Sequence, residues 1–158
     1  MMTDSCTICD LVSGRSRAPG GIVRDDGLWV VMHHPGIHAD PGELFVALQR
    51  HAESLGDLTA PEAAALGPLL RAGVAAIERV VAPERVYAAS YNERARHVHF
   101  FLLPRTRALP AGHVVSDLFR RARGILRGWH VVRNPSEQER AAAAERIRAE
   151  DVWPPNPG

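Results

Sequence analysis

The residues best suited to chemistry in this chain are two histidines that lie two positions apart, His97 and His99. They belong to the segment His97 to Leu103, whose composition predicts a strand ended by Pro104. Because side chains alternate between the two faces of a strand, both imidazoles share one face with Phe101. Two such imidazoles can share a metal, or one can act as a nucleophile, and a pair of ordinary surface histidines is equally compatible with the pattern.

A second candidate for chemistry is the pair formed by Cys6 and Cys9. The C-x-x-C spacing is typical of half of a tetrahedral zinc site, and histidines would have to complete it because the chain has only 2 Cys. A redox pair is less in keeping with the sequence, since no strand precedes Cys6 as in thioredoxin-type motifs. An inert pair of thiols is as compatible with the spacing as a metal site.

The basic residues exclude several kinds of chemistry, because all 19 of them are Arg. Without Lys the chain can form no side-chain Schiff base and can complete no P-loop. Cationic anchoring of a ligand therefore falls to Arg. With 18 acidic residues the formal net charge is +1, which gives no field that favours nucleic acid or an anionic membrane as a partner.

The length of 158 residues predicts one domain, over residues 1–158, that buries its own core. The first residues have neither the basic region nor the apolar run of a signal peptide. No apolar run approaches the ~20 residues that cross a bilayer. We therefore expect a cytoplasmic protein with no membrane partner.

The elements that must position these residues follow from hydrophobic periodicity and turn signals. We expect strands over 21–24, 28–32, 43–48 and 86–91 in addition to the histidine strand, and helices over 61–81, 116–126 and 136–150. Thr59 and Glu62 form a capping box at the start of the long helix, and the Pro-rich segment 151–158 is expected to be an arm on another surface or disordered. Strands joined by short turns around one long helix predict an α+β fold with an antiparallel sheet.

The order of these pieces resembles the histidine-triad (HIT) family of nucleotide hydrolases and transferases. The features that match are the cysteine pair, the hairpin, a strand ending in Gln49-Arg50-His51, the segment Ala52 to Thr59, the long helix and His97-x-His99. The similarity covers residues 6 to about 107, and its most specific part is the signature His-φ-His-φ-His-φ-φ, in which φ is apolar. It implies a HIT-like sheet, with residues 108–158 as a C-terminal helical extension.

The resemblance also implies roles for particular residues. HIT proteins use the middle histidine of the triad as a nucleophile on an α-phosphate, and that position here is His99. Members with the N-terminal cysteine pair bind a structural zinc, whose ligands here correspond to Cys6, Cys9, His51 and His97. Such a ligand set suits zinc on chemical grounds as well. HIT proteins commonly pair, so the resemblance implies a homodimer.

The third position of the triad departs from the family, because it is Phe101. In the family this residue lies near the phosphate and the leaving group, where a phenyl ring can neither donate a proton nor form a hydrogen bond. Loss of general-acid help ordinarily lowers a rate by about 10²- to 10⁴-fold. A slow or leaving-group-restricted transferase, a repurposed enzyme and a domain that binds without catalysis all stay open.

Other positions bear on a phosphate-bearing ligand. Arg105 has the strand parity of His99 and could bind an anion there through its planar guanidinium, although a solvated Arg at a strand end is an equal alternative. Asn92, in the turn before the strand, is a second candidate for a phosphate contact. Many HIT proteins hold the ribose with an Asp before the central strand, where this chain has histidines and, later in the loop, Asp40.

The sequence therefore favours a HIT-like nucleotide phosphohydrolase or nucleotidyltransferase with a structural zinc and a covalent intermediate on His99. Its expected partner is a phosphate-bearing, nucleotide-like small molecule. One alternative is a degenerate HIT domain that serves as a ligand-binding or partner module, which Phe101 favours. The other is a repurposed biosynthetic enzyme with a non-nucleotide substrate.

Overall fold

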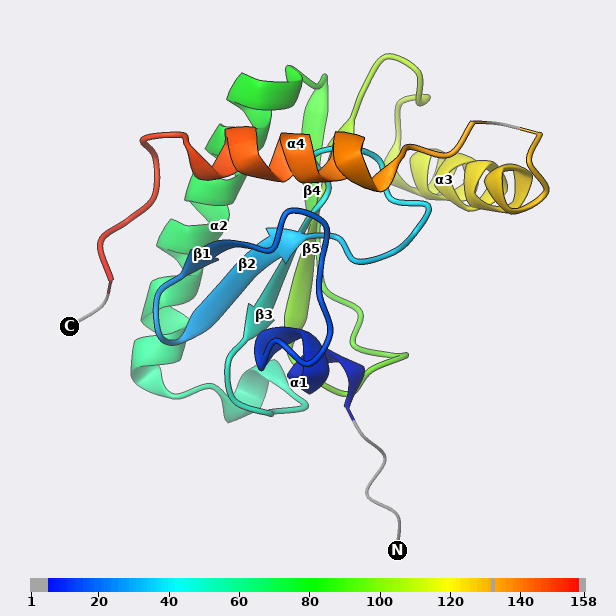
Figure 1. The fold of residues 1–158 in the computed structure, drawn as a ribbon. Coiled ribbons are helices and arrows are strands. Elements are labelled where there is room, and N and C mark those ends of the chain that lie inside the picture. The colour runs from blue at the N-terminus through cyan, green and yellow to red at the C-terminus, as the bar shows by residue number, and fades with distance from the viewer. Residues whose placement is uncertain (1–5, 132, 157–158) are drawn as a thin grey trace, which may run out of the picture.

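An antiparallel sheet of five strands forms the centre of the computed structural model, which describes residues 6–131 and 133–156 (Figure 1). The strands are β1 (Ile22–Asp25), β2 (Trp29–His33), β3 (Leu44–Leu48), β4 (Arg85–Ala89) and β5 (His99–Arg105). Their order across the sheet is β1-β2-β3-β5-β4, and every neighbouring pair is antiparallel. The expected α+β fold is confirmed.

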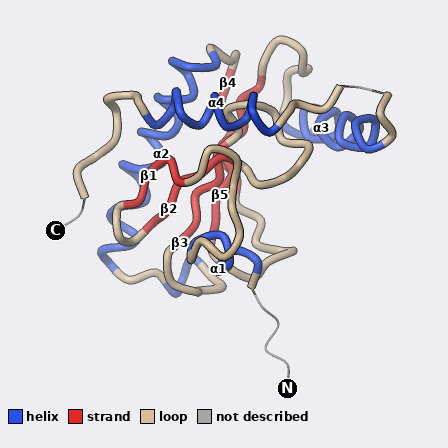
Figure 2. Tube along the Cα trace, in the orientation of Figure 1, coloured by secondary structure: helices blue, strands red, loops and turns tan. Residues whose placement is uncertain are grey.

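The two faces of the sheet are covered by different helices (Figure 2). On one face α2 (Ala60–Val81) and α4 (Glu137–Arg148) pack on the strands, and Leu69 and Ile147 join Leu102 in the larger core. On the opposite face α1 (Thr7–Val12) lies against the sheet, and Ile8 packs with Phe45 in a smaller core. The histidine side of β5 belongs to this second face, so α1 and not α2 borders the chemistry.

Helix α3 (His113–Gly128) extends away from the sheet (Figure 1), and arginines connect it to the loop between β2 and β3. Arg120 forms an ion pair with Glu43, and Arg127 pairs with Asp40 at 2.5 Å while donating to the carbonyl oxygen of His38 at 2.6 Å. Polar contacts of these arginines therefore link this helix to the loop.

The histidine strand lies two residues further along the chain than its sequence predicts. β5 begins at His99 and continues through Pro104 to Arg105. Pro104 is in register with Val86 of β4, but on the other side the pairing of β3 with β5 ends at Leu102, so no strand on that side needs the missing N–H. The carbonyl oxygen of Pro104 instead accepts a hydrogen bond from Arg120 at 2.5 Å.

The remaining predicted elements are present with small shifts at their ends, but α1 and the short 3-10 helix η1 (Leu55–Asp57) are not predicted. The described part of segment 151–158, which follows α4, lies on the surface of the fold as an arm, which is one of the two alternatives expected from the sequence. Trp153 packs against the larger core, and the carbonyl oxygen of Pro154 accepts from Arg24 at 2.7 Å. Residues 157 and 158 lie outside the described residues. Among the described residues, no helix combines the length and apolar character needed to cross a bilayer.

Helix α2 begins at the predicted capping box, which is part of a larger hydrogen-bond network. Thr59 accepts from the backbone N–H of Glu62, whose carboxylate accepts from the N–H of Thr59 at 2.7 Å. The same carboxylate accepts two bonds from Arg50, at 2.7 and 2.8 Å, and the indole of Trp29 donates to the Glu62 carbonyl. The hydrogen bond from Arg50 above all, together with the bonds to Thr59, lowers the pKa of Glu62 to about 2.

We expect Glu62→Gln to lower the free energy of unfolding at pH 7 by about 1–2 kcal/mol, because Arg50 is half exposed and solvent screens its pair. A carboxyl group whose pKa is depressed stabilises the fold fully above its ordinary value of 4.5 and loses that effect as the pH falls toward about 2. The wild type should therefore lose more stability than the variant over this range in urea unfolding. Glu84→Gln is the control, since its partner Arg107 is 93% exposed and the pair should contribute nothing measurable. Parallel acid profiles for wild type and Glu62→Gln would contradict the prediction.

Candidate functional site

Four side chains that could bind a metal come together where three separate segments meet. Their ligand atoms all lie within 4.8 Å of one another, and the four residues are Cys6, Cys9, His51 and His97. The cysteines come from the start and first turn of α1, and His51 follows β3. His97 is fully buried just before β5. The four residues that the sequence predicts as a ligand set therefore lie together in one cluster.

The distances within the cluster fit a tetrahedral ion. The Nδ1 atom of His97 lies 3.5 Å from the Sγ atoms of both cysteines, and Nδ1 of His51 lies 3.4 Å from Sγ of Cys9. With usual zinc bond lengths, a sulfur and a nitrogen on one tetrahedral ion are about 3.6 Å apart. Burial raises the pKa of the Cys9 thiol, as do the hydrogen bond and charge of Cys6, so a cation between the sulfurs is what would favour their thiolate forms.

The hydrogen bond made by Nε2 of His97 orients the ring so that Nδ1 faces the cysteines. Nε2 lies 2.8 Å from the carbonyl oxygen of Leu48 and donates a proton to it, which leaves Nδ1 with a free lone pair. A hydrogen bond from the far nitrogen to a carbonyl is a usual way to orient a metal-binding imidazole. Burial lowers the pKa of His97, which favours the neutral form that binds metals.

A hydrogen bond to the backbone fixes the His99 ring in the tautomer that a nucleophile requires, with a lone pair on Nε2. Its Nδ1 lies 2.6 Å from the carbonyl oxygen of His97 and must donate to it, so the lone pair of the ring is on Nε2. The ring stacks on Phe45 with centroids 4.9 Å apart and meets Phe101 edge to face at 5.0 Å. Burial lowers the pKa of His99, so the imidazole is neutral near pH 7.

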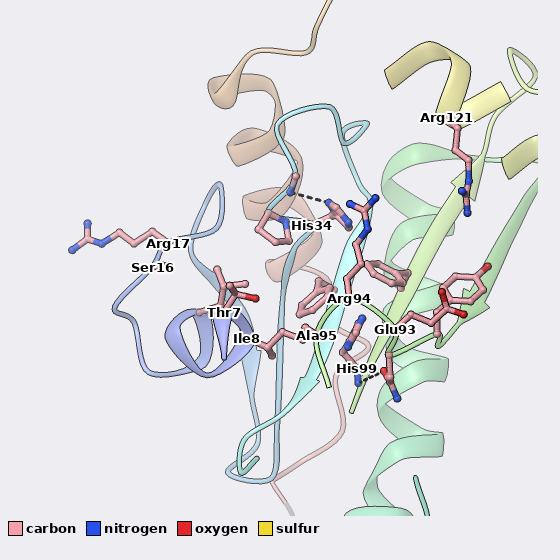
Figure 3. Close-up of a pocket in the computed structure, with 17 residues that line it drawn as sticks. Thr7, Ile8, Ser16, Arg17, His34, Glu93, Arg94, Ala95, His99 and Arg121 are labelled. Carbon is pink, nitrogen blue, oxygen red and sulfur yellow. Dashed lines mark hydrogen bonds between the residues drawn. The ribbon is translucent and has the colours of Figure 1, made fainter. Parts of the chain in front are cut away.

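A cavity of about 880 Å³ opens beside His99 (Figure 3). One wall is formed by α1 through Thr7, Ile8 and Leu11, and the opposite wall by the turn 91–95. The segment 34–36 and Arg121 of α3 also line it. Three arginines and one carboxylate line the cavity among the described residues: Arg17, Arg94, Arg121 and Glu93. The excess of positive charge favours an anionic ligand.

The structure brings one of the two predicted phosphate contacts to this cavity and leaves the other outside. Asn92 lines it with a left-handed backbone (φ 52°), and its Oδ1 accepts from the backbone N–H of His99 at 3.3 Å. Arg105 is not among the lining residues and donates to the carbonyl oxygen of Leu109 at 3.3 Å. Six residues of a strand span roughly 20 Å, so correct parity does not bring Arg105 to His99.

Asp40 does not enter the cavity of His99 either. It lines a neighbouring cavity, where both carboxylate oxygens are within 3.5 Å of arginines of α3, Arg123 and Arg127. The acid that could have served a ribose is therefore used to position a helix. The residues that the sequence does not identify as site residues are Arg94, Arg121 and His34. Arg121 lies in a helix that only tertiary structure brings to His99, whereas Arg94 lies in the turn before the histidine strand and His34 in the unusual His33-His34 pair, so both carry a local signal.

Comparison with known proteins identifies the fold. Neither protein-family models nor curated proteins match the sequence. Solved structures do match it, and three of them have TM-scores of 0.63 to 0.65. All three carry histidine triad or HIT-like names, so this chain has the fold of the histidine triad proteins.

A HIT-like protein involved in cell-cycle regulation from Bartonella henselae, solved with an unknown ligand, has a TM-score of 0.65 at 14% identity, over 92% of this chain and 96% of its own. A zinc-bound histidine triad family protein from Mycobacterium smegmatis has a TM-score of 0.65 at 18% identity, over 92% and 94%. A hypothetical histidine triad nucleotide-binding protein from Sulfolobus tokodaii has a TM-score of 0.63 at 12% identity, over 90% and 89%. The likeness extends beyond residue 107, into the C-terminal helices for which the sequence gives no specific match.

Proposed function

We propose that this chain is a zinc-containing phosphohydrolase or nucleotidyltransferase that acts on phosphoester or phosphoanhydride bonds through a covalent intermediate on His99. The observation that carries the proposal is the hydrogen bond from Nδ1 of His99 to the His97 carbonyl, which leaves an unprotonated Nε2 beside a cavity rich in Arg. The histidine triad fold and a solved neighbour named as a nucleotide-binding protein support the same ligand class.

The reaction would proceed in two displacements at phosphorus. The lone pair of His99 Nε2 forms an N–P bond while the bond from phosphorus to the leaving group breaks, and the leaving group departs with its electron pair. Water or another acceptor then attacks phosphorus, the N–P bond breaks, and His99 returns to its neutral form as the acceptor loses a proton to solvent. Phe45, stacked on the imidazole, and the His97 carbonyl keep the ring oriented through both steps.

Zinc has a structural role in this proposal. Cys6, Cys9, His51 and His97 would hold it, and bound zinc would join α1 and the end of β3 to the segment that carries His99. The zinc-bound neighbour of the same fold supports the choice of metal. A cytoplasmic homodimer is part of the proposal on the same family likeness.

We expect the p-nitrophenyl ester of thymidine 5′-monophosphate to label His99 covalently when the protein is quenched rapidly in alkali, which preserves phosphohistidine. Mass spectrometry should find a thymidylyl adduct on the peptide containing His99. His99→Ala should abolish the adduct and lower kcat/KM by at least about 10³-fold, because the nucleophile is lost. His130→Asn is the matched control, since His130 is exposed and has φ 60°, a backbone that Asn tolerates.

A ligand-binding module is the second candidate, and Phe101 is the observation that favours it, because its ring packs on Phe45 and His99 without any polar group. The labelling experiment separates the two functions. Binding of thymidine 5′-monophosphate by calorimetry, with neither adduct nor p-nitrophenolate release, would support the module and contradict the enzyme.

A further inference from the structure

His34 is the residue of the cavity that neither the metal cluster nor the nucleophile explains. It directly follows β2, and its backbone N–H donates to the carbonyl oxygen of Glu43 at 2.8 Å. The neighbouring His33 points into the fold, where Nδ1 bonds the His34 carbonyl and Nε2 accepts from the N–H of Gly42. The two histidines thus have separate roles, and the half-buried His34 is the one that lines the cavity of His99.

The turn that follows His34 determines where its ring carries the proton. The backbone N–H of Gly36 donates to Nδ1 at 2.9 Å, so Nδ1 is unprotonated and the proton of the neutral ring is on Nε2. Gly36 permits this packing, because a Cβ there would lie 2.6 Å from Cε1 and 2.8 Å from Nδ1 of His34. Among the described residues no acceptor is within hydrogen-bond distance of Nε2, and this atom is not among the buried unpaired ones.

The surroundings keep His34 neutral, so the donor at Nε2 persists at physiological pH. Burial lowers the pKa of His34 to about 4, and the groups that add to this effect are His33, His99, Arg120 and Arg140. A neutral imidazole whose Nδ1 already accepts a hydrogen bond cannot take up a proton without breaking that bond. It is suited to donate a fixed hydrogen bond and not to transfer a proton.

His34 also lies next to the position where the triad is incomplete. Its ring centroid is 5.3 Å from that of Phe101, with the planes tilted by 34°, and Phe101 in turn contacts His99 at 5.0 Å. All three rings line the cavity, and the apolar ring of Phe101 contacts both imidazoles. A substrate seated at His99 that extends past Phe101 would reach the ring of His34 next.

We propose that His34 donates an Nε2–H hydrogen bond to an oxygen of the phosphoryl substrate held at His99, and so supplies from β2 a polar contact that Phe101 cannot make from β5. The inference rests on the proposed function and names a substrate-contacting residue for it. His34 keeps its proton throughout, because the bond strengthens as negative charge builds on the phosphoryl oxygens and no bond to hydrogen breaks.

Two substitutions of His34 separate this role from a merely structural one, because each amide replaces one nitrogen of the ring. Asn places an oxygen near the position of Nδ1, so it can still accept from Gly36 but offers no donor at the position of Nε2. Gln places an amide N–H near Nε2 and loses the acceptor for Gly36. With the p-nitrophenyl ester, whose leaving group needs no proton, we expect His34→Asn to lower kcat by about 10²- to 10³-fold and His34→Gln to stay within about tenfold of wild type.

The opposite order, with the Asn variant active and the Gln variant inactive, would overturn the proposal and assign His34 to the turn. His38→Gln is the control from the same loop, since its ring faces Asn134 at 3.4 Å and it is not a lining residue of the His99 cavity. Thermal unfolding of all three variants establishes that each is folded before rates are compared.

A second measurement does not require turnover and keeps the two proposals distinguishable. In protein labelled with ¹⁵N at histidine, the Nε2–H tautomer of His34 should be visible, and its Nε2 signal should shift when orthovanadate, a mimic of pentacoordinate phosphorus, is added. A shift at His34 without a covalent adduct on His99 would retain the contact and reject the covalent mechanism. Saturating vanadate that shifts His99 and leaves His34 unchanged, or vanadate that binds nowhere in the cavity, would reject the contact.

Discussion

Cys9→Ser protein should purify without zinc and unfold at a temperature about 10–20 °C or more below that of the wild type. The Sγ atom of Cys9 is within 3.5 Å of both imidazoles of the cluster, so its loss removes the ligand that contacts most of the others. Structural zinc in small sites binds with about 10–16 kcal/mol, which is comparable to the whole stability of about 5–15 kcal/mol of an ordinary domain. Elemental analysis and thermal unfolding monitored by circular dichroism measure both effects.

The control for this variant is Asp10→Asn, which changes the neighbouring residue of α1. Asp10 pairs with the exposed Arg15 and is not part of the cluster, so zinc content and melting temperature should be retained. A chelator that removes zinc from the wild type should reproduce the behaviour of Cys9→Ser. Metal-free wild-type protein with an unchanged melting temperature would contradict a structural zinc.

Phe101→His should increase turnover of substrates with poor leaving groups by about 10²- to 10⁴-fold, the usual effect of general acid–base catalysis. The position meets His99 at 5.0 Å and lines the same cavity, so an imidazole there can reach a departing alkoxide or amine. A thymidine 5′-phosphoramidate should show the full gain. The p-nitrophenyl ester should gain only a few-fold, because p-nitrophenolate leaves without a proton.

The comparison between the two substrates makes this prediction specific. Phe101→Leu is the control, since it removes the ring and supplies no donor, and it should raise neither rate. An unchanged rate for the phosphoramidate in folded Phe101→His would mean that the cavity does not place a leaving group at position 101. An equal gain for both substrates would mean that the ring limits access and not proton donation.

Much of the fold follows from local sequence signals. Thr59 and Glu62 predict the start of the long helix because a capping box is a contact among four consecutive residues. The alternation along the histidine strand correctly separates Leu102, in the larger core, from Phe101, in the smaller one. Helix α1 has six residues and no side-chain cap, so neither periodicity nor a capping signal could have indicated it.

The residues of the site could be predicted less completely than the fold. The alternation of a strand shows on which face a side chain lies, but it does not give the distance between two side chains. Arg105 illustrates this limit, since it has the expected parity and yet lies well beyond the cavity. Arg94 and Arg121 illustrate the converse, because they reach the cavity of His99 from a turn and from α3. Asp40 could not be excluded from ligand binding until its arginine partners were known.

His97 has two structural roles. Its ring belongs to the metal cluster, and its backbone carbonyl oxygen fixes the tautomer of His99. In the proposed enzyme the chemical state of the two thiols would therefore affect the activity of His99, although neither thiol contacts the substrate. Oxidation of Cys6 and Cys9 would release the metal and so remove the link between α1 and the segment whose His97 carbonyl fixes the tautomer of His99. In that state neither the ring of His99 nor the α1 wall of its cavity would keep the support that the bound metal gives.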